Sequence, residues 1–295
     1  MHLNYKQAVL LTLLAASLWG ISGTFGQFLF NERDMNVEWL ITVRLLISGS
    51  CLLLFARFRE KADTMAIWRE KKNIVPLLVF GIFGMLGVQY TYFAAIKHSN
   101  AATATVLQFT GPIIIALYLA AKYRRVPPFL ELIAILLAIL GTFLLVTQGR
   151  FDSLSISTTA LFFGLASAVT LALYSLQPKM LMQKYNASIV AGWGMLIGGV
   201  AFCFIHAPWA IEGKWDYQTV ISLAVIIILG TLIAFYAYLS GAKIIGAQKA
   251  SLLASAEPLV AVIISVVWLK TSFGLIDWIG SLLIISTIFL LSKNK

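Results

Sequence analysis

The chain has 295 residues, of which 60% are hydrophobic and only 12% are charged, and its mean hydropathy is +0.90. A soluble domain of this size carries about twice that fraction of charged residues, so composition excludes a soluble globular protein. The formal net charge is +10, but the basic residues lie in short stretches between apolar runs, which indicates membrane orientation and not a nucleic-acid partner.

Apolar runs of about 20 residues, long enough to cross ~30 Å of hydrocarbon, recur along the chain and predict an all-α membrane protein. Charged residues, Pro and Gly divide these runs into ten predicted transmembrane helices. Five lie in residues 1–150 and five in residues 151–295, which are the two predicted domains. In chain order the predicted spans are 8–30, 38–56, 74–96, 101–121, 129–147, 158–180, 188–207, 218–240, 249–269 and 274–291.

The Lys and Arg residues predict how the chain is inserted. With the N-terminus inside, sixteen of them fall in cytoplasmic connections and five in outer connections, while Arg44 lies within the second span. Cytoplasmic loops are enriched in Lys and Arg, so both termini are predicted to be cytoplasmic.

The third to fifth spans are repeated in the second half of the chain. The segment 92–145 matches the segment 238–291 at a constant offset of 146 residues. The shared positions include Tyr92/Tyr238, Lys97/Lys243, Ala104/Ala250, Leu107/Leu253, Pro112/Pro258 and Leu145/Leu291. Because each half holds an odd number of spans, the second half enters the membrane inverted relative to the first. Two inverted five-helix repeats place a substrate site near mid-bilayer where the halves meet, which is typical of transporters.

The chain resembles the EamA-type transporters of the drug/metabolite transporter superfamily. The resemblance is carried by Trp19-Gly20, by Arg44, and by the pattern Tyr-x4-Lys-x3-Ala-x2-Ala ending in Pro, which occurs at Tyr92–Pro112 and at Tyr238–Pro258. It implies a basket-like fold of ten helices around a central cavity lined by spans 1, 3, 4, 6, 8 and 9. It also implies a prokaryotic plasma (inner) membrane location and export of amino acids, metabolites or toxic compounds.

One departure from the family pattern is visible. Relatives often carry an acidic residue at the ends of spans four and nine. In this chain those stretches are basic, at 122–125 and 268–271.

Glu257 is the main candidate for coupling transport to protons. It lies about 12 Å inside span nine, where a carboxylate costs about 2.5–3.5 kcal/mol, so it should face protein or water and not lipid. Its repeat mate is Gly111, so only the second half carries the acid. Glu257 would act as a protonatable switch. The alternative is a carboxyl group that caps backbone amides next to Pro258 and never titrates.

Three further residues have predicted roles within the spans. Pro112 and Pro258 each remove a backbone donor at matching positions of the two halves, which predicts kinks that serve as hinges. Static bending is the alternative. Arg44 is predicted to be a structural charge that pairs with a buried carboxylate or with carbonyl groups, or that extends toward the membrane surface. A direct pair with Glu257 is left open.

Polar and aromatic residues on the spans that the resemblance assigns to the cavity are the candidates for substrate binding. An apolar cavity with a few hydrogen-bonding groups suits a small amphipathic metabolite. Helix-to-helix packing is an equal alternative for any one of these residues. Tyr90 and Tyr92 diverge by about 200° on a helix, so both cannot face the cavity. The candidates are Trp19, Ser22, Gln89, Tyr92, Gln108, Tyr174, Gln177, Tyr238 and Ser255.

Motifs typical of enzymes and of metal or cofactor sites are missing from the sequence, so we expect neither catalysis, a bound metal nor a cofactor. The predicted function is secondary active export of a small-molecule substrate by alternating access, in contact with membrane lipid and with proton coupling as an option. The alternatives are a passive facilitator or channel-like pore, and a membrane assembly subunit without flux. The oligomeric state, a homodimer included, is left open.

Overall fold

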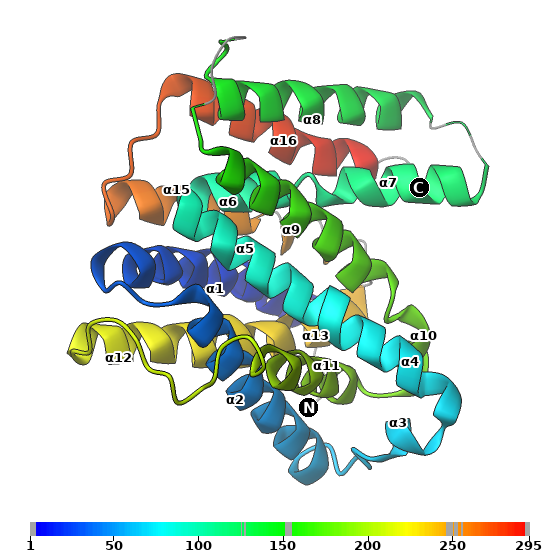
Figure 1. Ribbon diagram of the computed structural model, residues 1–295. Helices are drawn as coiled ribbons and strands as arrows, with labels where there is room; N and C mark the ends of the chain where they lie inside the picture. The colour runs from blue at the N-terminus through cyan, green and yellow to red at the C-terminus, as the bar shows by residue number, and fades with distance from the viewer. Residues whose placement is uncertain are drawn as a thin grey trace.

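The computed structural model describes residues 4–124, 126, 128–150, 155–245, 250, 253–254 and 256–292. Every regular element in these residues is a helix, which confirms the all-helical prediction. Hydrocarbon offers no water to backbone amides and carbonyls, so an apolar chain pairs these groups within helices. Figure 1 shows the helices packed as a bundle, with α8 and α16 side by side at one edge.

The helices carry the labels of Figure 1. The first half contains α1 (Tyr5–Glu32), α2 (Val37–Phe58), α3 (Ala66–Arg69), α4 (Lys71–Val79), the π-helix η1 (Phe80–Leu86), α5 (Gly87–His98), α6 (Ala101–Gln108), α7 (Gly111–Lys122) and α8 (Phe129–Thr147). The second half contains α9 (Thr158–Leu176), α10 (Lys179–Lys184), α11 (Ala187–Phe202), α12 (Tyr217–Ala224), the π-helix η2 (Val225–Ile233), α13 (Ala234–Ile245), α15 (Ala256–Val267) and α16 (Leu275–Ser292).

The observed helices fall on the predicted spans. Within the described residues, six continuous helical stretches are long and apolar enough to cross a membrane: Tyr5–Glu32, Val37–Phe58, Lys71–His98, Ala101–Lys122, Thr158–Lys184 and Tyr217–Ala242. Shorter apolar helices are Leu132–Thr147, Ala187–Phe202, Ala256–Val267 and Leu275–Thr287. Each stretch overlaps one predicted span, whereas the number of complete crossings stays a prediction.

Side-chain caps determine where several helices begin. Asn4, Asn36, Asn100 and Asp216 each accept a hydrogen bond from the backbone amide three residues later, at the starts of α1, α2, α6 and α12. Such caps satisfy amide groups that the first turn leaves without a helical partner. All four lie just ahead of a predicted span.

The two halves pack against each other through related pairs of helices. α2 packs on α11, α8 on α16, α5 on α9, and α1 on α13 and α15. The first two pairs join helices that hold the same place in the two halves, the second span in α2 and α11 and the fifth in α8 and α16. The α5–α9 pair joins the third span of the first half to the first span of the second half, and the α13–α1 pair is the same pair with the halves exchanged. A pseudo-two-fold axis between inverted repeats would produce such a pattern.

Two glycines allow α8 and α16 to approach closely. A Cβ on Gly141 would lie 2.6 Å from the carbonyl oxygen of Gly280, and a Cβ on Gly280 would lie 2.8 Å from the carbonyl oxygen of Gly141. Helices in membranes associate through small residues that let backbones come together. This pair lies outside the helices that line the cavity described below.

Gly141→Ala is expected to reduce the free energy of unfolding by about 1–3 kcal/mol, because the added methyl group must separate α8 from α16. Thermal unfolding in detergent measures the effect. Gly274→Ala is the control, since a Cβ there would lie 3.6 Å from Asp277 Oδ2, an ordinary contact. Equal melting temperatures for the two variants would contradict a tight α8–α16 contact.

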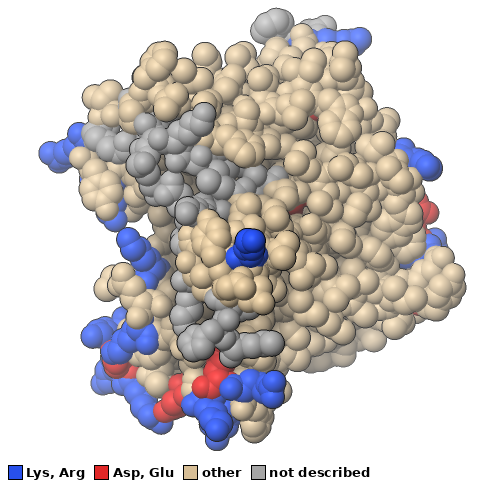
Figure 2. Space-filling view, turned by 180° about the vertical axis from the view of Figure 1, so that it is seen from behind, with Lys and Arg blue, Asp and Glu red and all other residues tan. Residues whose placement is uncertain are grey.

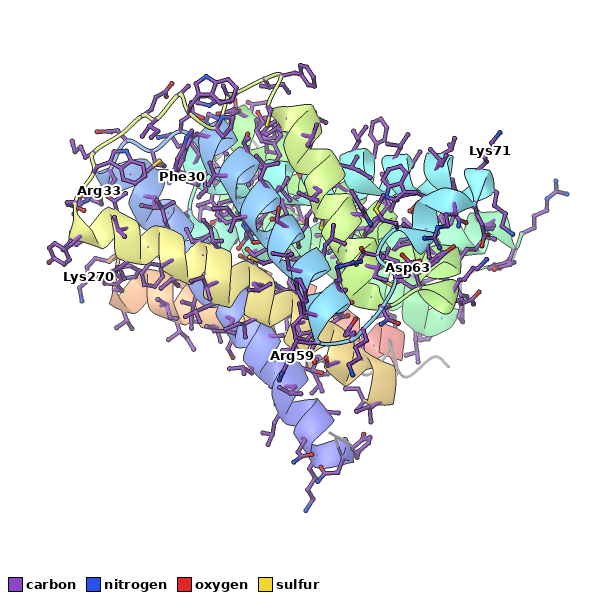
Figure 3. The ribbon with its side chains drawn as sticks, turned by 90° about the horizontal axis from the view of Figure 1, so that it is seen from below. Phe30, Arg33, Arg59, Asp63, Lys71 and Lys270 are labelled. Atoms are coloured by element: carbon purple, nitrogen blue, oxygen red, sulfur yellow. The ribbon has the colours of Figure 1, made fainter. Side chains whose placement is uncertain are left out.

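Charged residues gather at the ends of the helices. Figure 3 shows Arg33 and Lys270 together on one side of the molecule, with Arg59 and Lys71 away from them. This separation matches the predicted outer and inner groups, whereas which group faces the cytoplasm stays a prediction. In Figure 2, the largest group of charged atoms lies at the lower left, next to a broad uncharged surface.

At the predicted inner end, the connection between α2 and α4 is tied to the second half. Glu70 pairs with Lys184, and Glu60 accepts hydrogen bonds from Asn186 (2.9 Å) and Ser188. The hydrogen bond from Lys184 lowers the pKa of Glu70, which favours its charged form. These contacts join the halves at one end of the bundle.

Candidate functional site

A buried cavity of about 90 Å³ lies where helices of the two halves meet. Helices α1, α2, α5, α6, α9, α13 and α15 contribute to its wall. They include every span that the family resemblance assigned to the cavity, and α2 is added through Arg44. The lining residues are Trp19, Ser22, Arg44, Val88, Gln89, Tyr92, Phe93, Gln108, Leu171, Tyr174, Phe235 and Glu257.

The first span reaches the cavity because Gly20 lets α1 pass close to the start of α15. A Cβ on Gly20 would lie 2.7 Å from the carbonyl oxygen of Glu257 and 2.9 Å from the amide nitrogen of Ala261. A larger residue would push the helices apart. The close approach brings Trp19 and Ser22 into the same cavity wall as Glu257.

Helix α5 faces two different cavities. Gln89, Tyr92 and Phe93 line the buried cavity, whereas Tyr90 lines a second cavity. Tyr90 Oη donates a hydrogen bond to Glu38 Oε1 at 3.1 Å. The helix therefore directs Tyr90 and Tyr92 to different sides, as their spacing predicted.

The second cavity has a volume of about 340 Å³ and lies at the predicted outer end. Its wall carries both signs of charge, from Asp34, Glu38, Lys97 and Glu212. The larger cavity is thus charged and close to the helix ends. The smaller one is lined by helices of both halves, so the smaller one is the candidate transport site.

Arg44 is held in the buried cavity by two neighbours. Its Nε donates a hydrogen bond to Thr231 Oγ1 at 2.7 Å, and its guanidinium carbon lies 4.7 Å from the ring centre of Phe93. Only 4% of Arg44 is exposed. Among the ion pairs of the described residues, none joins Arg44 to Glu257, although both residues line the cavity.

Several polar atoms in the cavity wall are left without a partner. Trp19 Nε1, Ser22 Oγ, Arg44 Nη1 and both polar side-chain atoms of Gln89 are buried and accept or donate no hydrogen bond within the described part of the chain. Buried polar groups are normally hydrogen-bonded, and one left unpaired costs about 1–3 kcal/mol. Their concentration in one cavity makes its wall the candidate site for binding a polar group.

The other predicted binding residues lie around this wall or outside the described residues. Gln177 Nε2 donates a hydrogen bond to the carbonyl oxygen of Pro76 at 2.7 Å, just after the end of α9. Tyr238 packs on Trp19, with ring centres 5.2 Å apart. Neither residue is among the cavity lining. Ser255 lies outside the described residues.

The two prolines each lie in the first turn of a helix. Between α6 and α7 the helix is interrupted at Phe109 and Thr110, and Pro112 occupies the first turn of α7. Pro258 lies in the first turn of α15. Proline fits a first turn because its missing amide would have no helical partner there. Whether either position moves as a hinge stays a prediction.

Two features of the site were not predicted from the sequence. The first is the apolar part of the wall, formed by Val88, Phe93, Leu171 and Phe235. Apolar residues in a membrane helix carry no signal that separates a cavity from lipid. The second is Thr231, whose repeat mate is Met85, so the internal repeat does not mark it.

The π-helical segments were also missed. An offset of 146 residues places η1 (80–86) on residues 226–232 of η2, so both halves carry a π segment at the same position. π turns are rare and often occur at functional sites. A π turn closes its backbone hydrogen bond over one residue more than an α turn does, and the pattern of apolar residues does not reveal this difference.

A helical bundle with a cavity lined by both of its halves is typical of membrane transporters. The model of the EamA-like transporter family matches residues 6–147 and 158–293. The chain therefore belongs to the EamA-like transporter family, which confirms the resemblance seen in the sequence.

Individual relatives agree with this assignment. The chain is 40% identical over 290 residues to the uncharacterized inner membrane transporter YicL of Salmonella typhimurium (strain LT2), covering 98% of this chain and 96% of that protein. It is 26% identical over 232 residues to the threonine/homoserine exporter RhtA of Escherichia coli (strain K12), covering 78% of this chain and 73% of that protein. A solved crystal structure shares the fold at a TM-score of 0.65 and 19% identity, covering 97% of this chain and 96% of that one. These names point to a transporter and not to an enzyme.

Proposed function

We propose that this protein is a secondary active exporter of a small organic solute and works by alternating access. The unpartnered polar atoms of Trp19, Ser22, Arg44 and Gln89 carry the proposal, because they share one cavity between helices of both halves. A solute with hydrogen-bonding groups would satisfy them. In inverted-repeat transporters the substrate site lies at the interface of the repeats.

The charges in the cavity favour an amino acid as the solute. Arg44 offers an unpartnered Nη1 to an anionic group, and Glu257 offers a carboxyl group to a cationic one. An amino acid carries both groups on one carbon. The similarity to a threonine/homoserine exporter supports the same substrate class. L-Threonine is therefore the first solute to test.

The volume of the cavity supports alternating access over a pore. At about 90 Å³ it is well below the roughly 300–1,000 Å³ of common small-molecule sites. A bundle that opens to admit a solute and closes again around it would reconcile this volume with transport. The larger outer cavity, which begins at Tyr90 and Glu38, would serve as the exit route.

Counterflow in proteoliposomes tests the proposal. With no ion gradient, vesicles preloaded with unlabelled L-threonine should take up labelled L-threonine faster than empty vesicles, because a carrier returns more quickly when loaded. A channel-like pore would show equal rates.

A comparison of intracellular and medium metabolites, in cells with and without the protein, tests the direction and the solute class. We expect amino acids to shift toward the medium when the protein is present. A shift confined to compounds without an ammonium group would contradict the proposed solute, and no shift at all would favour an assembly subunit.

A further inference from the structure

Thr231 connects Arg44 to a π-helical segment. The residue lies in η2 and is fully buried. Its Oγ1 accepts the hydrogen bond from Arg44 Nε at 2.7 Å and donates one to the carbonyl oxygen of Ile226 at 2.8 Å. The single hydroxyl hydrogen is therefore used within η2, and the oxygen lone pairs remain for the guanidinium group.

This arrangement decides which part of Arg44 meets the cavity. Nε is bound to Thr231, and the guanidinium plane is held against the ring of Phe93. Nη1 is left without a partner in the described part of the chain. A guanidinium group fixed at Nε can present its Nη groups to a carboxylate without first losing rotational freedom.

We propose that Thr231 is a positioning residue for substrate binding: it holds Arg44 so that the Nη groups face the cavity and bind the anionic group of the solute. The inference rests on the proposed function, since it assigns the solute's anionic group to Arg44. Thr231 itself does not line the cavity and acts through Arg44.

The two halves differ at this position, which gives the site a direction. The repeat mate of Thr231 is Met85, a fully buried residue in η1 that has no hydroxyl group. At this repeat position the second half has a hydroxyl group that can hold a guanidinium group, and the first half has none. The anionic group of the solute would therefore lie on the side of the cavity where Arg44 is bound to η2.

The first experiment does not require a known solute. In protein labelled with ¹⁵N-arginine, the Nε–H signal of Arg44 is assigned by its loss in Arg44→Lys. Thr231→Val keeps the side-chain shape but removes the hydroxyl oxygen that accepts the hydrogen bond from Arg44 Nε–H. Exchange of the Nε–H hydrogen with water should therefore become about tenfold faster, which is the factor expected for the loss of one hydrogen bond to a charged group. Thr231→Ser should behave as the wild type.

Thr287→Val is the matched control for the loss of a buried threonine hydroxyl. Thr287 is fully buried in α16 and its hydroxyl donates to the carbonyl oxygen of Ile284; no hydrogen bond among the described residues joins it to an arginine. The Arg44 signal should be unchanged in this variant. An unchanged exchange rate in Thr231→Val would overturn the positioning role.

The second experiment compares L-threonine with L-threoninamide, which lacks the carboxylate. Thr231→Val should raise the half-saturation concentration for L-threonine about tenfold while leaving that for L-threoninamide and both maximal rates near wild type. A merely structural role would weaken both solutes equally. If the wild type transports neither solute, the proposed substrate is wrong. The hydrogen-exchange measurement at Arg44 Nε then still decides the role of Thr231.

Discussion

Glu257→Gln is expected to abolish gradient-driven solute flux while solute exchange survives, at a raised half-saturation concentration because the amide offers no negative charge to the solute's ammonium group. Glu257 is 8% exposed and lines the buried cavity, where an ionised carboxylate is costly unless it is paired. Gln keeps the size and most hydrogen bonds of Glu but cannot bind and release a proton. A carrier that exports solute against proton entry would then lose its driving force, whereas one-for-one solute exchange needs no proton.

Proteoliposomes with an imposed pH gradient measure this effect. Net flux through Glu257→Gln should fall to the level of vesicles without protein, and exchange at equal pH should continue. Glu212→Gln, at the outer end, is the control for loss of a carboxylate and should retain coupling. Wild-type pH dependence in a correctly inserted Glu257→Gln variant would contradict the coupling role and favour a carboxyl group that only caps the start of α15.

Arg44→Met is expected to weaken solute binding by about 1.5–3 kcal/mol, or roughly 10- to 150-fold in the half-saturation concentration. The substitution removes the charged donor from the cavity and keeps most of the apolar volume. It also leaves the carboxyl group of Glu257 without the opposite charge in the same cavity, so we expect lower thermal stability as well.

The double variant Arg44→Met/Glu257→Gln separates the two effects of Arg44. Removing both charges should restore much of the thermal stability, because no single charge is left buried, but should not restore solute affinity. Arg33→Met is the control. Arg33 does not line the cavity, and its Nε lies 3.1 Å from Asp216 Oδ2 in an ion pair. Equal affinity in the wild type and Arg44→Met would contradict the proposed binding role.

The fold could be predicted from the sequence to a large extent because membrane insertion is a strong constraint. Apolar length and the distribution of Lys and Arg mark helices without knowledge of their packing. Apart from the short α3, the observed helices from α1 to α16 overlap the predicted spans. The caps at Asn36, Asn100 and Asp216 lie at predicted span starts for the same physical reason, since a helix that enters hydrocarbon needs its first amides satisfied.

The polar part of the cavity wall was also accessible to sequence analysis. A polar residue in an apolar span is costly against lipid, so it tends to face protein, and the family resemblance supplied the choice of spans. Six of the nine predicted binding residues line the cavity: Trp19, Ser22, Gln89, Tyr92, Gln108 and Tyr174. Their role in binding stays a proposal.

The details that orient Arg44 could not be predicted. Its contact with Thr231 joins residues 187 positions apart and depends on how η2 is turned. The phase of a helix after a π segment shifts relative to a regular α-helix, so the face on which Thr231 lies does not follow from periodicity. The repeat gives no help, because Met85 has different chemistry.

The small volume of the cavity links this protein to the mechanical state of its bilayer. If the helices spread to admit a solute larger than about 90 Å³, the bundle occupies a larger area in the membrane plane. Part of the barrier to each turnover is then work against the lateral pressure of the surrounding acyl chains, as for other conformational steps that limit enzymes and carriers. Lipids that press helices together should slow this transporter, and lipids that relax that pressure should speed it, without touching any residue of the site.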